Sequence, residues 1–295
     1  MNKNIFVSFV FIALLMIFVY PWFIYSQLSL RNDSLTKHQK VGVKDSLPVF
    51  YKNLTERMTF PMSWLSGNYT DFSEWRKIAR EKLNQSLLYT PPEVPFNPII
   101  IGEEDRGSYV AKKVVLSISA DSRVLAYLLE PKGKCPFPGA LLLHDHSSRF
   151  DIGKEKMVRP FSVSGEKMQS SLEFVNETYG RRYVGDELAK AGYVCFIIDA
   201  LNWGDRGGGG YEGQQALASN LFNLGASFAG LIAYEDVRSA EFLAEQPKVD
   251  TTRIVSIGLS MGSFRSFQVA TLSDNIKAVN MLDSVDKGSG GPRCQ

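Results

Sequence analysis

The six residues Ile257-Gly258-Leu259-Ser260-Met261-Gly262 contain the pattern G-x-S-x-G. A β-branched run, TTRIVS (251–256), precedes them, and a helical run, SFRSFQVATL (263–272), follows. A serine at a sharp strand-to-helix turn has its hydroxyl at the carboxyl edge of a sheet, beside the N–H groups of a helix N-terminus. Such N–H groups can stabilise an oxyanion. The pattern therefore predicts Ser260 as a nucleophile; a small-residue turn without chemistry is the alternative.

The segments on both sides of this turn alternate between short apolar runs and amphipathic runs. Alternating strands and helices predict a doubly wound, mostly parallel sheet with crossover helices, an α/β fold. We expect a hairpin from the strands 109–119 and 122–131, buried strands at 138–146 and 193–200, helices at 185–193 and 226–247, and one more strand at 276–283.

The part of the chain before residue 106 has a different pattern. The apolar run from Ile5 to Tyr25 is 21 residues long, with Lys3 as the only charge before Arg31. This run predicts an exported signal peptide cleaved after Ser26, or an uncleaved membrane anchor, rather than a core helix. Either would put the domain outside the cytoplasm, in the periplasm, in the medium or on a membrane.

A helix is expected to begin after Asp71, since Glu74 stands at capping-box spacing, and a proline-rich linker, TPPEVPFNP (90–98), follows it. The predicted domains are a signal peptide or membrane anchor (1–26), a helical and extended lead-in (27–105) and a partial α/β-hydrolase domain (106–295).

Charge and cysteine content exclude several classes of protein. Lys and Arg total 33 and Asp and Glu total 31, so a net charge of +2 gives no reason to expect nucleic acid as a partner. Three cysteines are too few for a disulfide framework and lack metal-ligand spacing. The glycine run 207–213 formally matches a dinucleotide fingerprint, but no strand directly precedes it. No cofactor is therefore expected.

Over residues 109–285 the sequence resembles the α/β-hydrolases of the dienelactone hydrolase and acetyl xylan esterase kind. The resemblance rests on LLLHDH (141–146) with GKEKMVRP (153–160) behind it, on GRRYVGDELAKAGYVCFIIDALNWGDRG (180–207) and on IGLSMGSFRS (257–266). It implies that Ser260 is the nucleophile and that the N–H of Met261 is one oxyanion donor. It also implies a second donor from the loop around His146 and Ser147.

The triplet His144-Asp145-His146 allows a second interpretation. Residues i and i+2 of a strand share one face, so both imidazoles could reach one metal ion. No third ligand is evident in the sequence, so no metal is predicted and His144 is expected to be structural. Asp199 and the pair Asp205-Arg206 are expected to organise loops near the site.

A triad in this fold runs in the order Ser, Asp or Glu, His, yet no histidine follows Ser260. Asp283 and Asp286 are the candidate acids, and the family's later strands are missing, which predicts a truncated chain over a degenerate one. The resemblance implies an acyl-enzyme mechanism on small-molecule or carbohydrate esters. This chain alone is expected to be inactive, because no histidine follows Ser260 and a serine without a base is a weak nucleophile. The alternative is an exported, non-catalytic binding protein on the same fold.

Overall fold

The computed structural model describes residues 43–44 and 47–282. Contacts divide the chain into two units, Met1–Phe72 and Ser73–Gln295. The described part of the first unit is small: strands β1 (Val43–Lys44) and β2 (Leu47–Pro48), helix α2 (Val49–Arg57) and a 3-10 turn, η1 (Trp64–Ser66). The predicted export segment, 1–26, and the candidate acids Asp283 and Asp286 lie outside the described residues.

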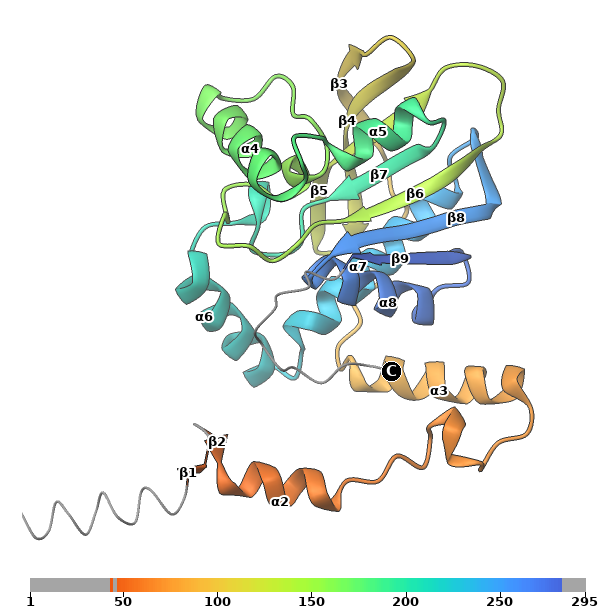
Figure 1. Cartoon of the computed structure of the whole chain (residues 1–295), viewed down its shortest axis with the longest axis vertical. Helices are drawn as coiled ribbons and strands as arrows, with labels where there is room; N and C mark the ends of the chain where they lie inside the picture. The colour runs from red at the N-terminus through yellow and green to blue at the C-terminus, as the bar shows by residue number, and fades with distance from the viewer. Residues whose placement is uncertain (1–42, 45–46, 283–295) are drawn as a thin grey trace, which may run out of the picture. The chain divides into compact units, whose positions relative to one another are not determined.

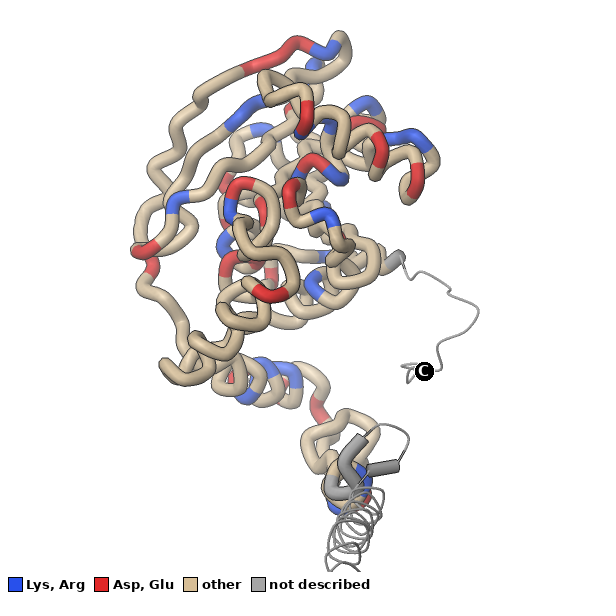
Figure 2. The backbone as a smooth tube through the Cα atoms, turned by 90° about the vertical axis from the view of Figure 1, so that its left-hand side faces the viewer, with Lys and Arg blue, Asp and Glu red and all other residues tan. Residues whose placement is uncertain are grey.

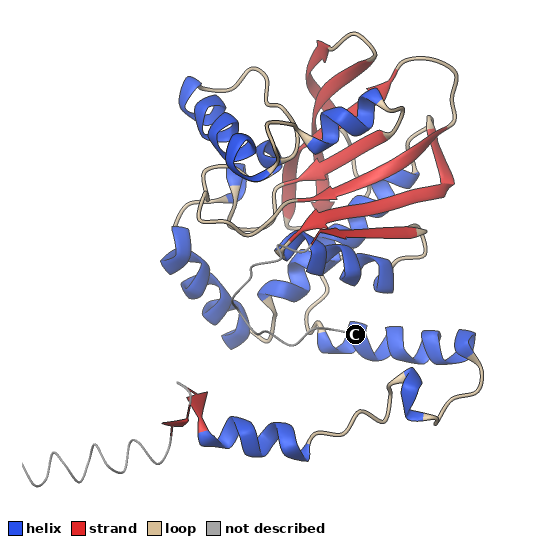
Figure 3. Cartoon of the chain, in the orientation of Figure 1, coloured by secondary structure: helices blue, strands red, loops and turns tan. Residues whose placement is uncertain are grey.

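The second unit contains a seven-stranded sheet in the order β3-β4-β5-β7-β6-β8-β9 (Figures 1 and 3). Its strands are β3 (Ile99–Asp105), β4 (Tyr109–Ser119), β5 (Ser122–Pro131), β6 (Phe137–Leu143), β7 (Val194–Ile198), β8 (Val249–Leu259) and β9 (Ala278–Leu282). The last four are parallel, as the sequence predicted. The first three are antiparallel, so the sheet is mixed.

Helices on both faces of this sheet follow from the right-handed crossovers between parallel strands. Helices α7 (Phe228–Ala244) and α8 (Met261–Leu272) pack on one face, and α5 (Val184–Lys190) packs on the other (Figure 1). Each face has its own apolar core, one including Phe196, Phe242 and Leu243, the other including Leu142, Val158 and Ile197. The parallel strands are therefore buried on both sides, which explains their continuous apolar runs.

The remaining helices of this unit, α3 (Phe72–Ser86), α4 (Gly165–Thr178) and α6 (Gly210–Asn223), follow the sequence-based expectations less closely. Helix α3 starts directly after Asp71 as predicted, but it has no fully buried residue, and its first residue, Phe72, is 55% exposed. No helix is predicted from the sequence at α4 or at α6, and both helices are present in the structure. Among the described residues no single helix is long and apolar enough to span a membrane; α6 and α7 pass that test only as a pair bent by 92°.

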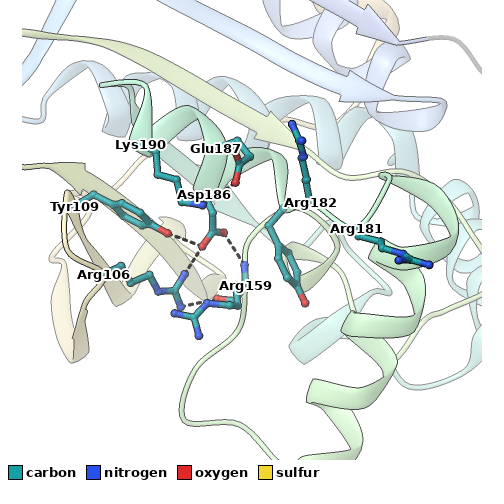
Figure 4. A pocket seen from close by; sticks show the side chains of 9 residues that line it. Arg106, Tyr109, Arg159, Arg181, Arg182, Asp186, Glu187 and Lys190 are labelled. Atoms are coloured by element: carbon teal, nitrogen blue, oxygen red, sulfur yellow. Dashed lines mark hydrogen bonds and ion pairs between the residues drawn. The ribbon is translucent and has the colours of Figure 1, made fainter.

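Strand β3 lies inside the predicted lead-in 27–105 but is paired in the sheet with β4. The hairpin that it forms is tied to α5 by Asp186, which is buried (Figure 4). The Asp186 carboxylate accepts hydrogen bonds from Tyr109 Oη (2.6 Å), Arg106 Nη1 (2.7 Å) and the Arg159 N–H (2.8 Å). Basic and acidic residues are both scattered along the tube in Figure 2, as the balanced composition implies.

Candidate active site

Ser260 lies at the turn between β8 and α8, as the sequence predicted. Its backbone has φ 56° and ψ −115°, a conformation that non-glycine residues rarely adopt. Strain of this kind persists only where the surroundings enforce it, and it is typical of functional positions. The turn directs the Ser260 side chain out of the sheet edge and leaves the first N–H groups of α8 without helical acceptors.

Two glycines make this turn possible. A Cβ at Gly258 would collide with the backbone of Gly262, and a Cβ at Gly262 would collide with Leu143 O on the neighbouring strand β6. The helix therefore starts in direct contact with both strands. This contact explains why the pattern requires glycine two residues before and two residues after the serine.

The hydroxyl of Ser260 lies 2.8 Å from Nδ1 of His146. The imidazole comes from the loop after β6, the strand adjacent to β8, so the two side chains meet at the carboxyl edge of the parallel strands. An imidazole nitrogen at hydrogen-bond distance from a serine hydroxyl is the arrangement that activates a serine nucleophile. The sequence analysis proposed His146 for its backbone N–H and missed this side-chain contact.

The loop that carries His146 is held by two neighbours. Trp203, which is buried, donates from Nε1 to His146 O (3.0 Å), and its ring stacks on Phe150 with centroids 5.2 Å apart. Asp145, also buried, accepts the N–H of Ser147 on Oδ1 (3.0 Å). The Ser147 N–H predicted as an oxyanion donor is therefore already engaged with Asp145 in this structure.

His144 is fully buried behind the loop and uses both ring nitrogens. Nε2 accepts the N–H of Ala200 (2.9 Å), and Nδ1 lies 2.8 Å from Asp145 O, so Nδ1 carries the proton. Burial, with Arg265 and Lys156 nearby, holds the pKa of His144 well below its usual range. A neutral imidazole with both nitrogens occupied has no lone pair left for a metal. No cluster of metal-ligating side chains occurs among the described residues.

A buried ion pair supports the same loop from the helical side. Arg265 on α8 makes two hydrogen bonds to Asp236 on α7, at 2.9 and 2.6 Å, and both side chains are buried. Arg265 Nη1 also lies 3.4 Å from His144 O. No local sequence pattern indicates this pair, because the two residues lie 29 positions apart on different helices.

Asp199, at the end of β7, organises the segment behind the loop, as the sequence suggested. Its carboxylate accepts hydrogen bonds from the N–H of Lys154 (2.6 Å), from Lys154 Nζ (2.7 Å) and from the N–H of Asp205 (3.0 Å). Lys154 and Lys167, acting against partial burial, lower the pKa of Asp205 to about 2. Burial alone would lower the pKa of Lys154. The negative charges of Asp199, Glu155 and Asp205 outweigh this effect and raise the pKa above its ordinary value.

Comparison with known proteins is consistent with this geometry. The family model described as "Abhydrolase family" matches residues 49–285. A protein of Bacillus subtilis (strain 168) described as "Putative hydrolase YtaP" is 25% identical over 213 residues, which cover 72% of this chain and 65% of that protein. The chain therefore spans less than two thirds of the length of this relative.

Comparison with solved structures includes a match with a TM-score above 0.5 and others below it. A structure from Bacteroides fragilis NCTC 9343 described as a "putative acetyl xylan esterase" superposes with a TM-score of 0.57 and 20% identity, covering 70% of this chain and 52% of that one. An acetyl xylan esterase from Paenibacillus sp. R4 gives a TM-score of 0.44 and 17% identity, covering 72% and 59%. The first similarity confirms the predicted fold.

Proposed function

The chain belongs to the Abhydrolase family, and from that premise we propose that it is a serine hydrolase acting on carboxylic esters. The observation that carries the proposal is the 2.8 Å contact between Ser260 Oγ and His146 Nδ1, made by a serine in a strained backbone conformation. Ser260 attacks the ester carbonyl and His146 accepts the hydroxyl proton. An acyl-enzyme and an alcohol result, and water then releases the acid.

The oxyanion is stabilised by backbone N–H groups. The N–H of Met261, the first residue of α8, has no helical acceptor and follows the nucleophile directly. The second donor was predicted from the loop at His146 and Ser147. Since the Ser147 N–H donates to Asp145, we assign this role to the N–H of His146.

An orienting acid for His146 is not assigned. Nε2 of His146 has no carboxylate within hydrogen-bond distance among the described residues, and the candidate acids Asp283 and Asp286 lie outside them. Loss of the orienting acid in a serine triad costs about 10⁴-fold in kcat. The sequence-based expectation of an inactive chain rested on the lack of a histidine after Ser260; with His146, which precedes Ser260, as the proposed base, that lack no longer requires inactivity.

The substrate proposal is coarser than the mechanism. The Bacteroides relative is described as an acetyl xylan esterase, which favours acetyl esters of carbohydrates as substrates. No nucleic-acid partner or cofactor is proposed. Export or membrane anchoring through residues 1–26 stays a proposal from the sequence.

The proposal is tested with 4-nitrophenyl acetate and a fluorophosphonate probe on the full chain. We expect Ser260→Ala to abolish both probe labelling and hydrolysis. We expect His146→Ala to reduce both strongly, while the control His38→Ala, outside the described residues, changes neither. Undiminished hydrolysis by Ser260→Ala would assign the chemistry to another residue. An unlabelled, inactive wild type that still binds esters would favour the non-catalytic binding protein.

A further inference from the structure

A second pocket lies over β4 and β5, three strands from Ser260 in the sheet order. Its volume is about 260 Å³, which suits a small ligand. The lining comes from both strands, from the turns η2 (Lys154–Lys156) and η3 (Gly204–Arg206), from the loop before α4 and from α4 itself. The lining residues include Lys113, Tyr127, Glu155, Ser162, Lys167 and Asp205.

Lys113 and Tyr127 are the central pair of this pocket. They are directly opposite each other in the antiparallel register of β4 and β5, so their side chains share one face of the sheet. The ring of Phe161 joins them, with Lys113 Nζ 5.2 Å and the Tyr127 ring 5.7 Å from its centroid. The side chains of Lys113 and Tyr127 therefore line the same pocket from the same face of the sheet.

The hydroxyl of Tyr127 has no hydrogen-bond partner among the described residues. The side chain is fully buried, so its O–H is also withheld from bulk water. Leaving a buried hydroxyl unpaired is unfavourable, and native proteins rarely retain such a group without a use for it. A ligand that accepts this hydrogen bond would recover the cost.

The Lys113 ammonium group is also buried with fewer hydrogen bonds than it can donate. It is 9% exposed, and Nζ donates to a single acceptor, Ser162 O, at 2.8 Å. No carboxylate of the described residues forms an ion pair with it. The nearest acidic side chains of the pocket are already bound: Asp205 to Lys154 and Lys167, and Glu155 to Lys154 at 2.9 Å. Burial accordingly lowers the pKa of Lys113.

We propose that this pocket binds a small carboxylate, held between Lys113 Nζ and the Tyr127 hydroxyl. Two donors with unused hydrogen bonds, one of them cationic, match an acceptor that has two oxygens and one negative charge. A neutral sugar hydroxyl would leave the Lys113 charge unpaired. The more basic pocket in Figure 4 differs, because its buried Arg106 is already paired with Asp186. The proposed site is independent of Ser260.

The test measures binding of acetate and of its neutral isostere acetamide to the purified full chain, by saturation-transfer NMR and by thermal unfolding. We expect acetate to bind and to raise the unfolding temperature, and acetamide to do neither. Lys113→Met should abolish acetate binding. Tyr127→Phe, which removes one unpaired oxygen and keeps the fold, should weaken binding about tenfold.

Two controls separate this site from others. Lys112→Met, on the opposite face of β4, should leave acetate binding unchanged, as should Ser260→Ala, which would also remove esterase activity. Equal binding of acetate and acetamide would overturn the proposal, because it would show that the negative charge is not recognised. Unchanged acetate binding in Tyr127→Phe would also overturn it, because it would show that the hydroxyl does not contact the ligand. Loss of acetate binding in Ser260→Ala would also overturn it, by assigning the acetate to the esterase site.

Discussion

The ammonium group of Lys154 lies 2.7 Å from the carboxylate of Asp199, and neither side chain is exposed to solvent. The pair joins the end of β7 to the segment that follows the His146 loop. Two glycines pack tightly against the Asp199 carboxylate. A Cβ at Gly153 would collide with this carboxylate, and a Cβ at Gly204 would lie 2.5 Å from it, so the carboxylate has no room for another arrangement. The geometry around the proposed active site is therefore fixed by a buried charge pair as well as by apolar packing.

We first predict that Asp199→Asn destabilises the protein strongly. The substitution leaves the Lys154 ammonium buried with less compensating charge, and breaking a buried pair costs about 3–5 kcal/mol. Urea unfolding of the two proteins measures the difference. The matched control is Glu187→Gln, which breaks the exposed pair with Lys190 and should cost less than about 1 kcal/mol. Similar losses for both variants would contradict this account.

Our second prediction concerns the turn at Ser260. Gly262→Ala forces a Cβ into Leu143 O, so β6 and α8 must separate. We expect a loss of several kcal/mol, about the size of a strained backbone or overpacked core position, together with loss of fluorophosphonate labelling. Gly165→Ala at the start of α4 is the control, because its Cβ meets no atom within 4 Å. Thermal unfolding compares the two, and an unperturbed Gly262→Ala would refute the contact argument.

Much of this arrangement follows from sequence patterns, and the rest does not, for physical reasons. The turn at Ser260 and the hairpin 109–131 are predictable because their signals are local. The first is a serine with a glycine two residues before it and another two residues after it, and the second is a pair of strand-like runs around a two-residue turn. The contact between His146 and Ser260 spans 114 residues, and it depends on β6 and β8 becoming neighbours in the sheet. The pair of Arg265 and Asp236 spans only 29 residues, but it depends on α7 and α8 packing against each other.

Helix α6 was missed for a different reason. Two of its first four residues, Gly210 and Gly213, are glycines, which have low helix propensity, and the residue before the helix, Gly209, offers no side-chain cap. The helix forms all the same, and Tyr211 in its first turn packs edge-to-face on Phe150, with centroids 4.9 Å apart. Tertiary packing has overridden local preference here.

The third prediction concerns alkaline pH. Burial lowers the pKa of Lys156 to about 8 from an unfolded value of 10.5. Between these values the unfolded chain binds more protons at Lys156 than the folded one, so the free energy of unfolding rises with pH. The window ends near pH 10, where tyrosines such as Tyr109, whose pKa is raised by burial in the folded state, act in the opposite direction.

This pH dependence is measured by chemical unfolding between pH 7.5 and 9.5. The difference between wild type and Lys156→Met should increase with pH by at most about 1.4 kcal/mol per unit, the limit for one proton. Lys190→Met, at an exposed position, supplies the control and should show no such slope. A flat difference for Lys156→Met would show that Lys156 keeps its charge in the folded protein.

The last prediction tests how the base is positioned. Trp203→Phe keeps an aromatic ring against Phe150 but removes the Nε1–H that donates to His146 O. The imidazole then loses one anchor, and small displacements of a reacting group reduce rates by about 10- to 100-fold. We expect kcat for 4-nitrophenyl acetate to fall by about this amount while KM changes little, because the substrate does not contact Trp203 in the proposed mechanism. Trp75→Phe on α3 is the control and should retain full activity. If kcat is unchanged in Trp203→Phe, the loop is held by Asp145 alone, and the indole serves packing rather than catalysis.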